Sequence, residues 1–313
     1  MKKYLVGIDI GGTTVKLGLF DLNGELLDKW EIETRKTEKG RYILSDIAKS
    51  IEGILNERKI KKEKVLGVGV GVPGPVKEDG TVLGCVNLGW PVFNVSTELE
   101  KILGLPVKVA NDANIAALGE MFKGGGKGYK NMIMVTLGTG VGGGVIINGK
   151  VLAGNNGAGG EIGHISVNPH EKISCNCGKK GCLEQYASAT GIVKLAKDAL
   201  EKENCESKLR DIKEITAKDI FDFAKENEQL SLEVVDKFAS ILGRALANIS
   251  CICDPEVFVI GGGVSKAGDI LIDKVKQYYR ENAFHATVDT KFKVAKLGND
   301  AGIFGGAKLS LEI

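Results

Sequence analysis

No apolar run in the 313-residue sequence approaches the roughly 20 residues that a membrane-spanning helix requires. The N-terminal stretch MKKYLVGIDIGG has two lysines followed by an aspartate and paired glycines, so it lacks the apolar core of a signal peptide. Charges of both signs nearly cancel, with 42 Lys+Arg against 40 Asp+Glu. The net charge of +2 gives no sign of the excess of positive charge that binding to nucleic acid or an anionic membrane requires. We therefore expect neither as a partner.

Cysteine is also scarce and odd in number, with seven residues of which three fall between Glu161 and Glu184. This usage fits a reducing cytoplasm better than a disulfide framework, so we expect a cytoplasmic protein. Four cysteines have no obvious metal partner and are interpreted as structural: Cys85, Cys205, Cys251 and Cys253. The 43% hydrophobic and 26% charged composition is typical of a globular protein. The length predicts two domains, each with its own core.

The densest group of chemically distinctive residues is the run EIGHISVNPHEKISCNCGKKGCLE at 161–184. Its cysteines follow the pattern C-x-C-x4-C at Cys175, Cys177 and Cys182. Glycines between them supply the tight turns that let thiolates converge on one tetrahedral zinc ion. His164 or His170 would complete a closed, structural Cys3His site; the alternative is three free or buried thiols. Glu161 and Glu184 at the ends of the run suggest acceptors for a polyhydroxylated ligand, although Glu184 also suits a helix N-terminus.

Residues Tyr4 to Thr34 predict three antiparallel strands, with a bend at Gly11-Gly12. The chain continues after the bend as a strand, so the helix that a dinucleotide fold or P-loop requires is missing. Backbone N–H groups and the hydroxyls of Thr13 and Thr14 still suit phosphate oxygens. Asp9 would be unfavourable beside phosphate without a cation, which makes it a candidate Mg2+ residue. The alternative is a plain β-hairpin with a glycine turn.

A second copy of this layout begins at Asn131, as NMIMVTLGTGVGGGVIINGKVLAG. Strand, glycine bend, strand, Asn-Gly turn and strand recur in the same order, which indicates an internal duplication into two related domains that face a nucleotide. The second bend contains Gly138, Thr139 and Gly140. A third element, VFVIGGGVSKAGDIL, predicts a strand followed by a helix, and its bend at 261–263 would let adenosine approach the backbone.

Between these bends, residues 43–55 show a helical apolar stripe, and VLGVGVGV predicts a buried parallel strand. Val107–Ala110 predicts another strand, which ends at Asn111-Asp112 before a helix. Ligands of open α/β sheets collect at such strand ends, so Asp112 is a candidate catalytic group, with a helix N-cap as an equal alternative. Further helices are predicted near 186–203, 217–226 and 232–253, strands at 257–260 and 292–296, and a closing helix from Asp300, while 204–214 reads as a surface excursion.

Six motifs together resemble the ROK family (repressor, open reading frame, kinase), and within it the bacterial glucokinases of Gram-positive type. They are DIGGT at 9–13, VPGPV at 72–76, NDAN at 111–114, LGTGVGGG at 137–144, EIGHI at 161–165 and CNCGKKGCLE at 175–184. The form DIGGTTVKLGLF with NLGW at 87–90 is similar to the glucokinases more than to the amino-sugar or fructose kinases. The resemblance implies an α/β, two-domain, actin-like (ribonuclease-H-like) ATPase fold with a nucleotide and sugar cleft. The expected domains are 1–118 plus 300–313 and 119–299, the latter with the zinc loop 161–184.

The resemblance also implies roles for individual residues. Asp112 would be the catalytic base, and His164 rather than His170 would bind zinc with Cys175, Cys177 and Cys182. The implied sugar contacts are Asn87, Asn111, Asp112, Glu161, His164 and Glu184. The expected nucleotide and Mg2+ contacts are Asp9, Gly11, Gly12, Thr13, Thr14, Lys16, Gly138, Thr139, Gly140, Gly262 and Gly263.

The implied reaction is ATP-dependent phosphorylation of the 6-hydroxyl of glucose, with ATP, Mg2+ and structural zinc as cofactors, in a homodimer or homotetramer. Alternatives within the family are an N-acetylmannosamine kinase or fructokinase. A sugar-sensing repressor is a further alternative, but it would need a helix-turn-helix, and only eight residues precede Asp9. An actin-like chaperone or filament protein would give no role to the zinc loop or NDAN.

Overall fold

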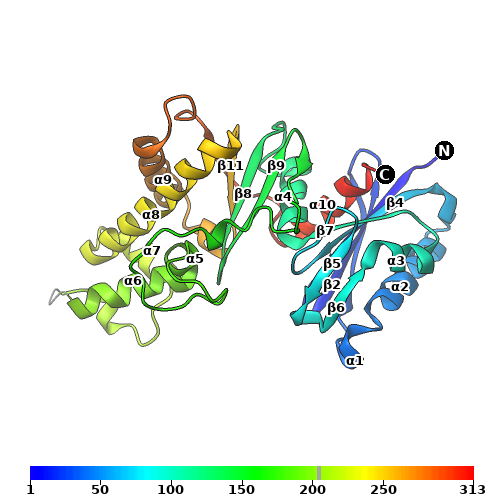
Figure 1. Cartoon of the computed structure of the whole chain (residues 1–313), viewed down its shortest axis with the longest axis horizontal. Coiled ribbons are helices and arrows are strands. Elements are labelled where there is room, and N and C mark those ends of the chain that lie inside the picture. Colours follow the sequence, from blue (N-terminus) through cyan, green and yellow to red (C-terminus); the bar gives the residue numbers. More distant parts are fainter. Residues whose placement is uncertain (203–205) are drawn as a thin grey trace. The chain divides into compact units, whose positions relative to one another are not determined.

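The computed structural model describes residues 1–202 and 206–313, and this part of the chain separates into two compact units (Figure 1). The first unit contains residues 1–130, 144–160 and 296–313, and the second contains 131–143 and 161–295. The sequence analysis expected domain boundaries after residue 118 and before residue 300, which differ from the divisions of these units. Residues 119–130 join the first unit because α4 (Asp112–Lys123) continues without a break through residue 118 and packs on α10 (Ala301–Ser310).

The first sheet has five strands in the order β3-β2-β1-β4-β7. Their bounds are β1 (Tyr4–Ile10), β2 (Thr14–Asp21), β3 (Leu26–Glu33), β4 (Val65–Val72) and β7 (Val107–Asn111). The first three strands are antiparallel, as predicted, and β4 pairs in parallel with both β1 and β7. All residues of β4 except Leu66 are buried, which explains its continuous apolar run.

Helices cover both faces of this sheet. On one face, α2 (Ile43–Glu57) and α3 (Val95–Leu103) bury their apolar stripes against strand residues such as Val6 and Val70. On the other face, Ile303 and Ala307 of α10 pack with Leu5 and Phe20. The backbone of α10 approaches so closely that a Cβ on Gly7 would lie 1.9 Å from the carbonyl oxygen of Ile303. The predicted closing helix is therefore present. It can pack this closely because the strands carry glycines where it crosses them.

The second sheet repeats the strand order of the first, as β10-β9-β8-β11-β12. Its strands are β8 (Met132–Leu137), β9 (Val141–Ile147), β10 (Lys150–Val151), β11 (Val257–Gly261) and β12 (Lys291–Val294). In both sheets an antiparallel hairpin forms one edge and parallel strands follow, with β11 parallel to β8 and β12. The internal duplication inferred from the sequence is confirmed at the level of topology.

The helices of the second unit are α5 (Glu184–Ala187), α6 (Ala189–Lys202), α7 (Ala217–Lys225), α8 (Gln229–Cys253) and α9 (Asp269–Asn282). The helix expected near 186–203 is present as α6, but it begins at Ala189, because Ser188 is extended and separates α5 from α6. The Ser188 hydroxyl accepts the N–H of Gly191 at 3.0 Å and so caps the new helix. After the glycines at 261–263 a short 3-10 turn, Gly263–Ala267, precedes α9, where a direct strand-to-helix transition was expected.

The remaining elements are α1 (Thr37–Gly40) and the hairpin of β5 (Thr81–Cys85) and β6 (Trp90–Asn94). Part of the predicted surface excursion, Asn204 and Cys205, lies outside the described residues. The described remainder, 206–214, is exposed or half-buried as expected, except for Leu209, which lies in a 3-10 turn (Lys208–Asp211) and is fully buried. Cys85 is buried, whereas Cys251 is exposed. Among the described residues, no helix combines the length and apolar character needed to cross a membrane.

Candidate active site

Asn111 and Asp112 stand where β7 ends and α4 begins. The side-chain oxygen of Asn111 accepts the N–H groups of Ala113 and Asn114 at 2.9 and 3.2 Å, so Asn111 is the N-cap of α4. Its amide nitrogen donates to the carbonyl of Gly74 at 3.0 Å, which ties the VPGPV loop to the strand end. Asp112 is the first residue of the helix and is exposed. The interpretation of Asp112 as the helix cap is therefore wrong.

Asp9, in β1, belongs to the same end of the first sheet. Burial raises the pKa of Asp9 to about 6, and the negative charge of Asp112 adds to the shift, while Lys16 opposes it. Lys16 lies directly opposite Asp9 in the antiparallel pair of β1 and β2, and its ammonium group donates to the carbonyl of Asn299 at 3.2 Å. Two carboxylates thus share one environment in which a bound cation would be stabilised.

The bend at Gly11–Thr14 joins β1 to β2. The N–H of Gly11 donates to the carbonyl of Thr14 at 3.0 Å, and the hydroxyl of Thr34 closes the bend from β3 by donating to the Gly11 carbonyl at 2.7 Å. Thr13 is exposed, and Gly12 has open space on its Cβ side. The bend is therefore a preformed loop that presents an exposed threonine beside two glycines, a composition that suits a phosphate contact.

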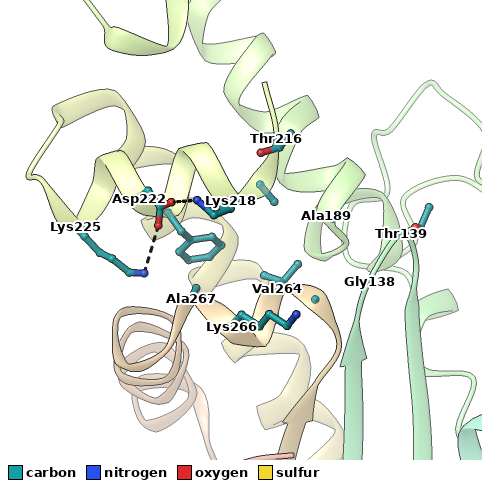
Figure 2. A pocket seen from close by; sticks show the side chains of 13 residues that line it. Gly138, Thr139, Ala189, Thr216, Lys218, Asp222, Lys225, Val264, Lys266 and Ala267 are labelled. Atoms are coloured by element: carbon teal, nitrogen blue, oxygen red, sulfur yellow. Dashed lines mark hydrogen bonds and ion pairs between the residues drawn. The ribbon is translucent and has the colours of Figure 1, made fainter. Parts of the chain in front are cut away.

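The second and third glycine elements meet in the second unit. Gly262 has a φ of 83°, and a Cβ there would lie 2.4 Å from the carbonyl oxygen of Leu137 at the end of β8. This close approach brings residues 262–263 beside the bend at 138–140. The two elements line one cavity of about 490 Å³, together with residues of α7 and the N-terminus of α6 (Figure 2).

Several residues that line this cavity had no role in the sequence interpretation. They are Ala189, Thr216, Ala217, Lys218, Phe221, Asp222, Lys225, Val264, Lys266 and Ala267. Figure 2 shows Asp222 between Lys218 and Lys225, to which it is paired at 2.5 and 3.5 Å. The amphipathic pattern of α7 predicts a helix but gives no sign that one of its faces lines a cavity.

Four side chains of the 161–184 loop converge as a candidate metal site. The donor atoms of His164, Cys175, Cys177 and Cys182 all lie within 4.8 Å of one another. The Cys177 and Cys182 sulfurs are 3.6 Å apart, and Cys175 Sγ is 3.8 Å from His164 Nδ1. Tetrahedral zinc with bonds of about 2.3 Å would place its ligand atoms roughly 3.7 Å apart. The donor set and its spacing therefore fit zinc, with His164 as the histidine and His170 outside the group.

The pKa values of the three thiols are shifted in different directions by their surroundings. Burial raises the pKa of Cys182 to about 12, and it also raises the pKa of Cys175. In contrast, the N–H of Lys179 lowers the pKa of Cys177. Buried, mutually repelling thiolates are unfavourable without a cation between them, and a bound metal deprotonates its thiol ligands.

Glu161 and Glu184 lie beside this metal-site candidate, and each contacts one of its members. Nε2 of His164 is 3.9 Å from a Glu161 oxygen, so the ring presents one nitrogen to the cysteines and the other to Glu161. One oxygen of Glu184 accepts the N–H of Val141 at 3.1 Å, and the other lies 3.6 Å from Cys175 Sγ. A Cβ on Gly140 would lie 2.3 Å from Glu184, so that glycine makes room for the carboxylate. Glu184 therefore links the cysteine cluster to the second glycine bend.

Asn87, the remaining predicted sugar contact, is exposed on a 3-10 turn, Val86–Leu88, after β5. Burial raises the pKa of Cys85, which immediately precedes this turn, and the charge of Asp112 contributes to the shift. Asn87 is thus on a turn near Asp112. Within the first unit the predicted residues Asp9, Asn87, Asn111 and Asp112 occupy one region.

Comparison with known proteins connects this geometry to a family. The chain is 47% identical to a protein named Glucokinase from Halalkalibacterium halodurans, over 98% of this chain and 94% of that protein. It is 36% identical to a Glucokinase from Thermotoga maritima, over 99% and 98% of the two chains. A crystal structure of a ROK family glucokinase from Streptomyces griseus, in complex with glucose and AMPPNP, has a TM-score of 0.74 at 32% identity and covers 99% of this chain and 100% of its own.

The predicted actin-like sugar kinase fold is confirmed by this solved structure. The family model of the ROK family matches residues 5–313, which is nearly the whole chain. The resemblance that six short motifs suggested thus extends through the elements between them. The chain belongs to the ROK family.

Proposed function

We propose that this protein is an ATP-dependent glucokinase, which transfers the γ-phosphoryl group of ATP to the 6-hydroxyl of glucose. Its similarity over nearly full length to proteins named Glucokinase supports the reaction and the substrates. The mechanism rests mainly on one observation at the end of β7, where Asn111 and Asp112 have different structural roles. Asn111 caps α4, which leaves Asp112 at the strand end as an exposed carboxylate in the first turn.

In the proposed reaction Asp112 accepts the proton of the 6-hydroxyl as the sugar oxygen attacks phosphorus. The bond between that oxygen and the γ-phosphorus forms while the bond to the β,γ-bridging oxygen breaks, which yields glucose 6-phosphate and ADP. Asp112 lies at the N-terminus of α4, where the helix dipole stabilises its carboxylate. The hydroxyl proton thus passes to a group that the fold keeps near the reacting oxygen.

The nucleotide contacts follow from the glycine elements. We assign the phosphates to the bends at Gly11–Thr14 and Gly138–Gly140, and the adenosine to the cavity beside Gly262-Gly263. The size and apolar character of that cavity, with Phe221 and Val264, suit a base, and Lys266 is a cation on its wall. Asp9 and Lys16 would complete the phosphate end. Mg2+ supplies neutralisation of phosphate charge when bound, and Asp9 is the residue that we assign to it, directly or through water.

We assign the sugar contacts to Asn87, Asn111, Asp112, Glu161, His164 and Glu184. Carboxylates and amides of this kind accept and donate hydrogen bonds to several hydroxyl groups at once. His164 would bind zinc through Nδ1 and keep Nε2 for the sugar, as its orientation toward Cys175 and Glu161 suggests. Zinc in this closed Cys3His set has a structural role: it holds the face that reads the hydroxyls.

We further propose that the protein is cytoplasmic and acts as a homodimer or homotetramer. Three of the seven cysteines gather at one candidate metal site, and this usage supports a reducing compartment. Light scattering coupled to size-exclusion chromatography would measure the assembly.

A coupled assay of purified protein with ATP and a panel of hexoses tests the function. Glucose should give the highest kcat/KM, and 2-deoxyglucose or another deoxy analogue should lose roughly ten- to hundredfold where the bound sugar covers a carboxylate and leaves it unpaired. Faster turnover of N-acetylmannosamine or fructose would identify another kinase of the same family. Binding of a sugar without phosphorylation of any member of the panel would identify a sensor.

A further inference from the structure

A compact polar network lies behind the cysteine cluster, on the side of α5 away from Glu184. At its centre is Glu171, whose side chain is only 10% exposed. One Glu171 oxygen accepts the hydroxyl of Tyr186 at 2.5 Å and the ammonium group of Lys194 at 2.8 Å. The other oxygen accepts the N–H groups of Lys172 and Ile173 at 2.8 and 3.0 Å. The carboxylate therefore joins the loop to α5 and α6 at once.

The network continues through neighbouring amides. Asn168 donates to the hydroxyl of Tyr186 at 2.8 Å, so that the tyrosine hydroxyl has partners on both sides. The carboxamide of Gln185 donates to the Ile173 carbonyl at 3.0 Å and accepts the N–H groups of Gly181 and Cys182 at 2.8 and 3.1 Å. None of these contacts uses a metal-binding atom of the cluster.

The geometry of α5 connects this network to the sugar site. Glu184 and Tyr186 are two residues apart on one helical turn, so their side chains point to opposite faces. Tyr186 is buried, and its hydroxyl is held by Glu171, while Glu184 faces Val141 and Cys175. A helix of four residues has too few internal hydrogen bonds to hold its own orientation. Contacts on the Tyr186 face must therefore help to orient Glu184.

We propose that Glu171 is a positioning residue for sugar binding, which acts through Tyr186 to orient the α5 turn and Glu184 independently of the metal. This inference rests on the proposed function for the identity of the ligand. Zinc orders the cysteine side of the loop, and Glu171 orders the side toward α6. Losing either one weakens glucose binding, and losing both weakens it further.

The test uses Glu171→Gln and Tyr186→Phe, with Glu226→Gln as the matched control. Glu226 pairs with Lys208 at 2.6 Å in the same unit, but both side chains are more than half exposed. The amide in Glu171→Gln places a donor where four donors already converge, and the phenylalanine removes only the hydroxyl. Each variant is assayed for KM of glucose and of ATP, for kcat, and for zinc release to a chromogenic chelator. Amide hydrogen exchange over residues 181–187 is measured in parallel.

Both variants should raise KM for glucose about tenfold, with kcat and KM for ATP within threefold of wild type, because binding is lost equally in the ground and transition states. Amide exchange over 181–187 should be faster, and the control should match wild type. An unchanged KM for glucose overturns the proposal whatever the exchange shows. A common rise in both KM values also overturns it, since that indicates general loosening of the unit.

Added zinc distinguishes the contribution of the metal from that of Glu171. If saturating zinc returns KM for glucose to the wild-type value, Glu171 acts only through metal retention and the proposal is wrong. If KM stays high with a full zinc content, the positioning role is independent of the metal. Should the wild-type protein phosphorylate no hexose, the proposed function fails, while exchange and zinc release still test whether Glu171 orders the α5 turn.

Discussion

Gly302 of α10 lies directly against the carboxylate of Asp9: a Cβ at this position would be 2.5 Å from Asp9 Cγ and 2.6 Å from one of its oxygens. A helix from the end of the chain thus supplies the wall of a pocket that holds an aspartate from the first strand. Because Asp9 is the residue that we assign to Mg2+, this contact couples the packing of α10 to the nucleotide site.

The first prediction concerns this contact. Gly302→Ala should displace Asp9 and lower kcat/KM for MgATP by about tenfold or more, while stability falls by only about 1–3 kcal/mol, typical of overpacking. Gly53→Ala is the matched control, because Gly53 is an exposed glycine within α2 with no atom within 4 Å of its Cβ position. The control should leave activity unchanged and stabilise its helix slightly. Equal kinetics for Gly302→Ala and wild type would contradict the role of Asp9.

The second prediction is a pH dependence of stability caused by Asp9. Its pKa is about 6 in the folded protein against an ordinary value of 3.8, so the folded state holds the proton more tightly. Ionisation of Asp9 therefore costs stability as pH rises from about 3.8 to 6, and the full cost of about 3 kcal/mol remains above that window. Asp9→Asn should raise the free energy of unfolding at pH 8 in nucleotide-free protein and have little effect at pH 4.

Urea denaturation at the two pH values measures this difference. Asp112→Asn should reduce the loss of stability between pH 4 and pH 8, because the Asp112 charge contributes to the raised pKa of Asp9. The same Asp9→Asn variant should lose affinity for MgATP. An equal gain in stability at pH 4 and pH 8 would show that the carboxylate charge is not the cause.

The third prediction concerns the base. Asp112→Asn should lower kcat for glucose phosphorylation by about 10²–10⁴ and leave glucose affinity and zinc content largely intact. Folding should survive because Asn111, not Asp112, caps α4. Asn111→Ala should cost about 0.5–2 kcal/mol of stability, since it removes the cap and the tie to Gly74. If Asp112→Asn keeps more than about a tenth of wild-type kcat, another residue is the base.

The fourth prediction concerns the metal. Elemental analysis of protein purified without chelator should give one zinc per chain, and Cys177→Ser should lose it. Removal of zinc should loosen residues 161–184 and weaken glucose binding in parallel. Cys251→Ser is a suitable control, because Cys251 is an exposed thiol outside the cluster. Full zinc content in Cys177→Ser would remove that cysteine from the ligand set.

The fifth prediction concerns the cavity of the second unit. Ala267→Leu should place additional carbon atoms in this cavity and raise KM for ATP several-fold, because base and side chain would occupy the same space. KM for glucose is the internal control and should stay within twofold of wild type. A rise in KM for glucose alone would assign the cavity to the sugar.

Patterns within short stretches of sequence determined much of the fold. Three cysteines within eight residues can reach one ion whatever the rest of the chain does, so the C-x-C-x4-C spacing alone indicates a metal site. The glycine bends are also local, because a strand, a turn and a second strand follow one another directly. Their recurrence in the same order reveals the duplication, which the matching strand orders of the two sheets confirm.

Tertiary structure decided which of two neighbouring residues does each task. Asn111 and Asp112 are both good helix caps by type, and only the backbone path from β7 into α4 makes Asn111 the cap. His164 and His170 are both close to the cysteines in sequence, and only the fold of the loop brings the His164 ring to Cys175. The break at Ser188 likewise depends on hydrogen bonds that no periodicity records.

The cavity and the Glu171 network required contacts between distant segments. The cavity draws on residues near 138, 216–225 and 263–267, and Glu171 reaches Tyr186 and Lys194 across 15 and 23 residues. Apolar periodicity shows which face of each segment is buried, but it does not show against which other segment that face packs. Hydrogen bonds of this kind have directions and lengths that only the packed chain defines, so their polar residues look like ordinary surface residues in the sequence.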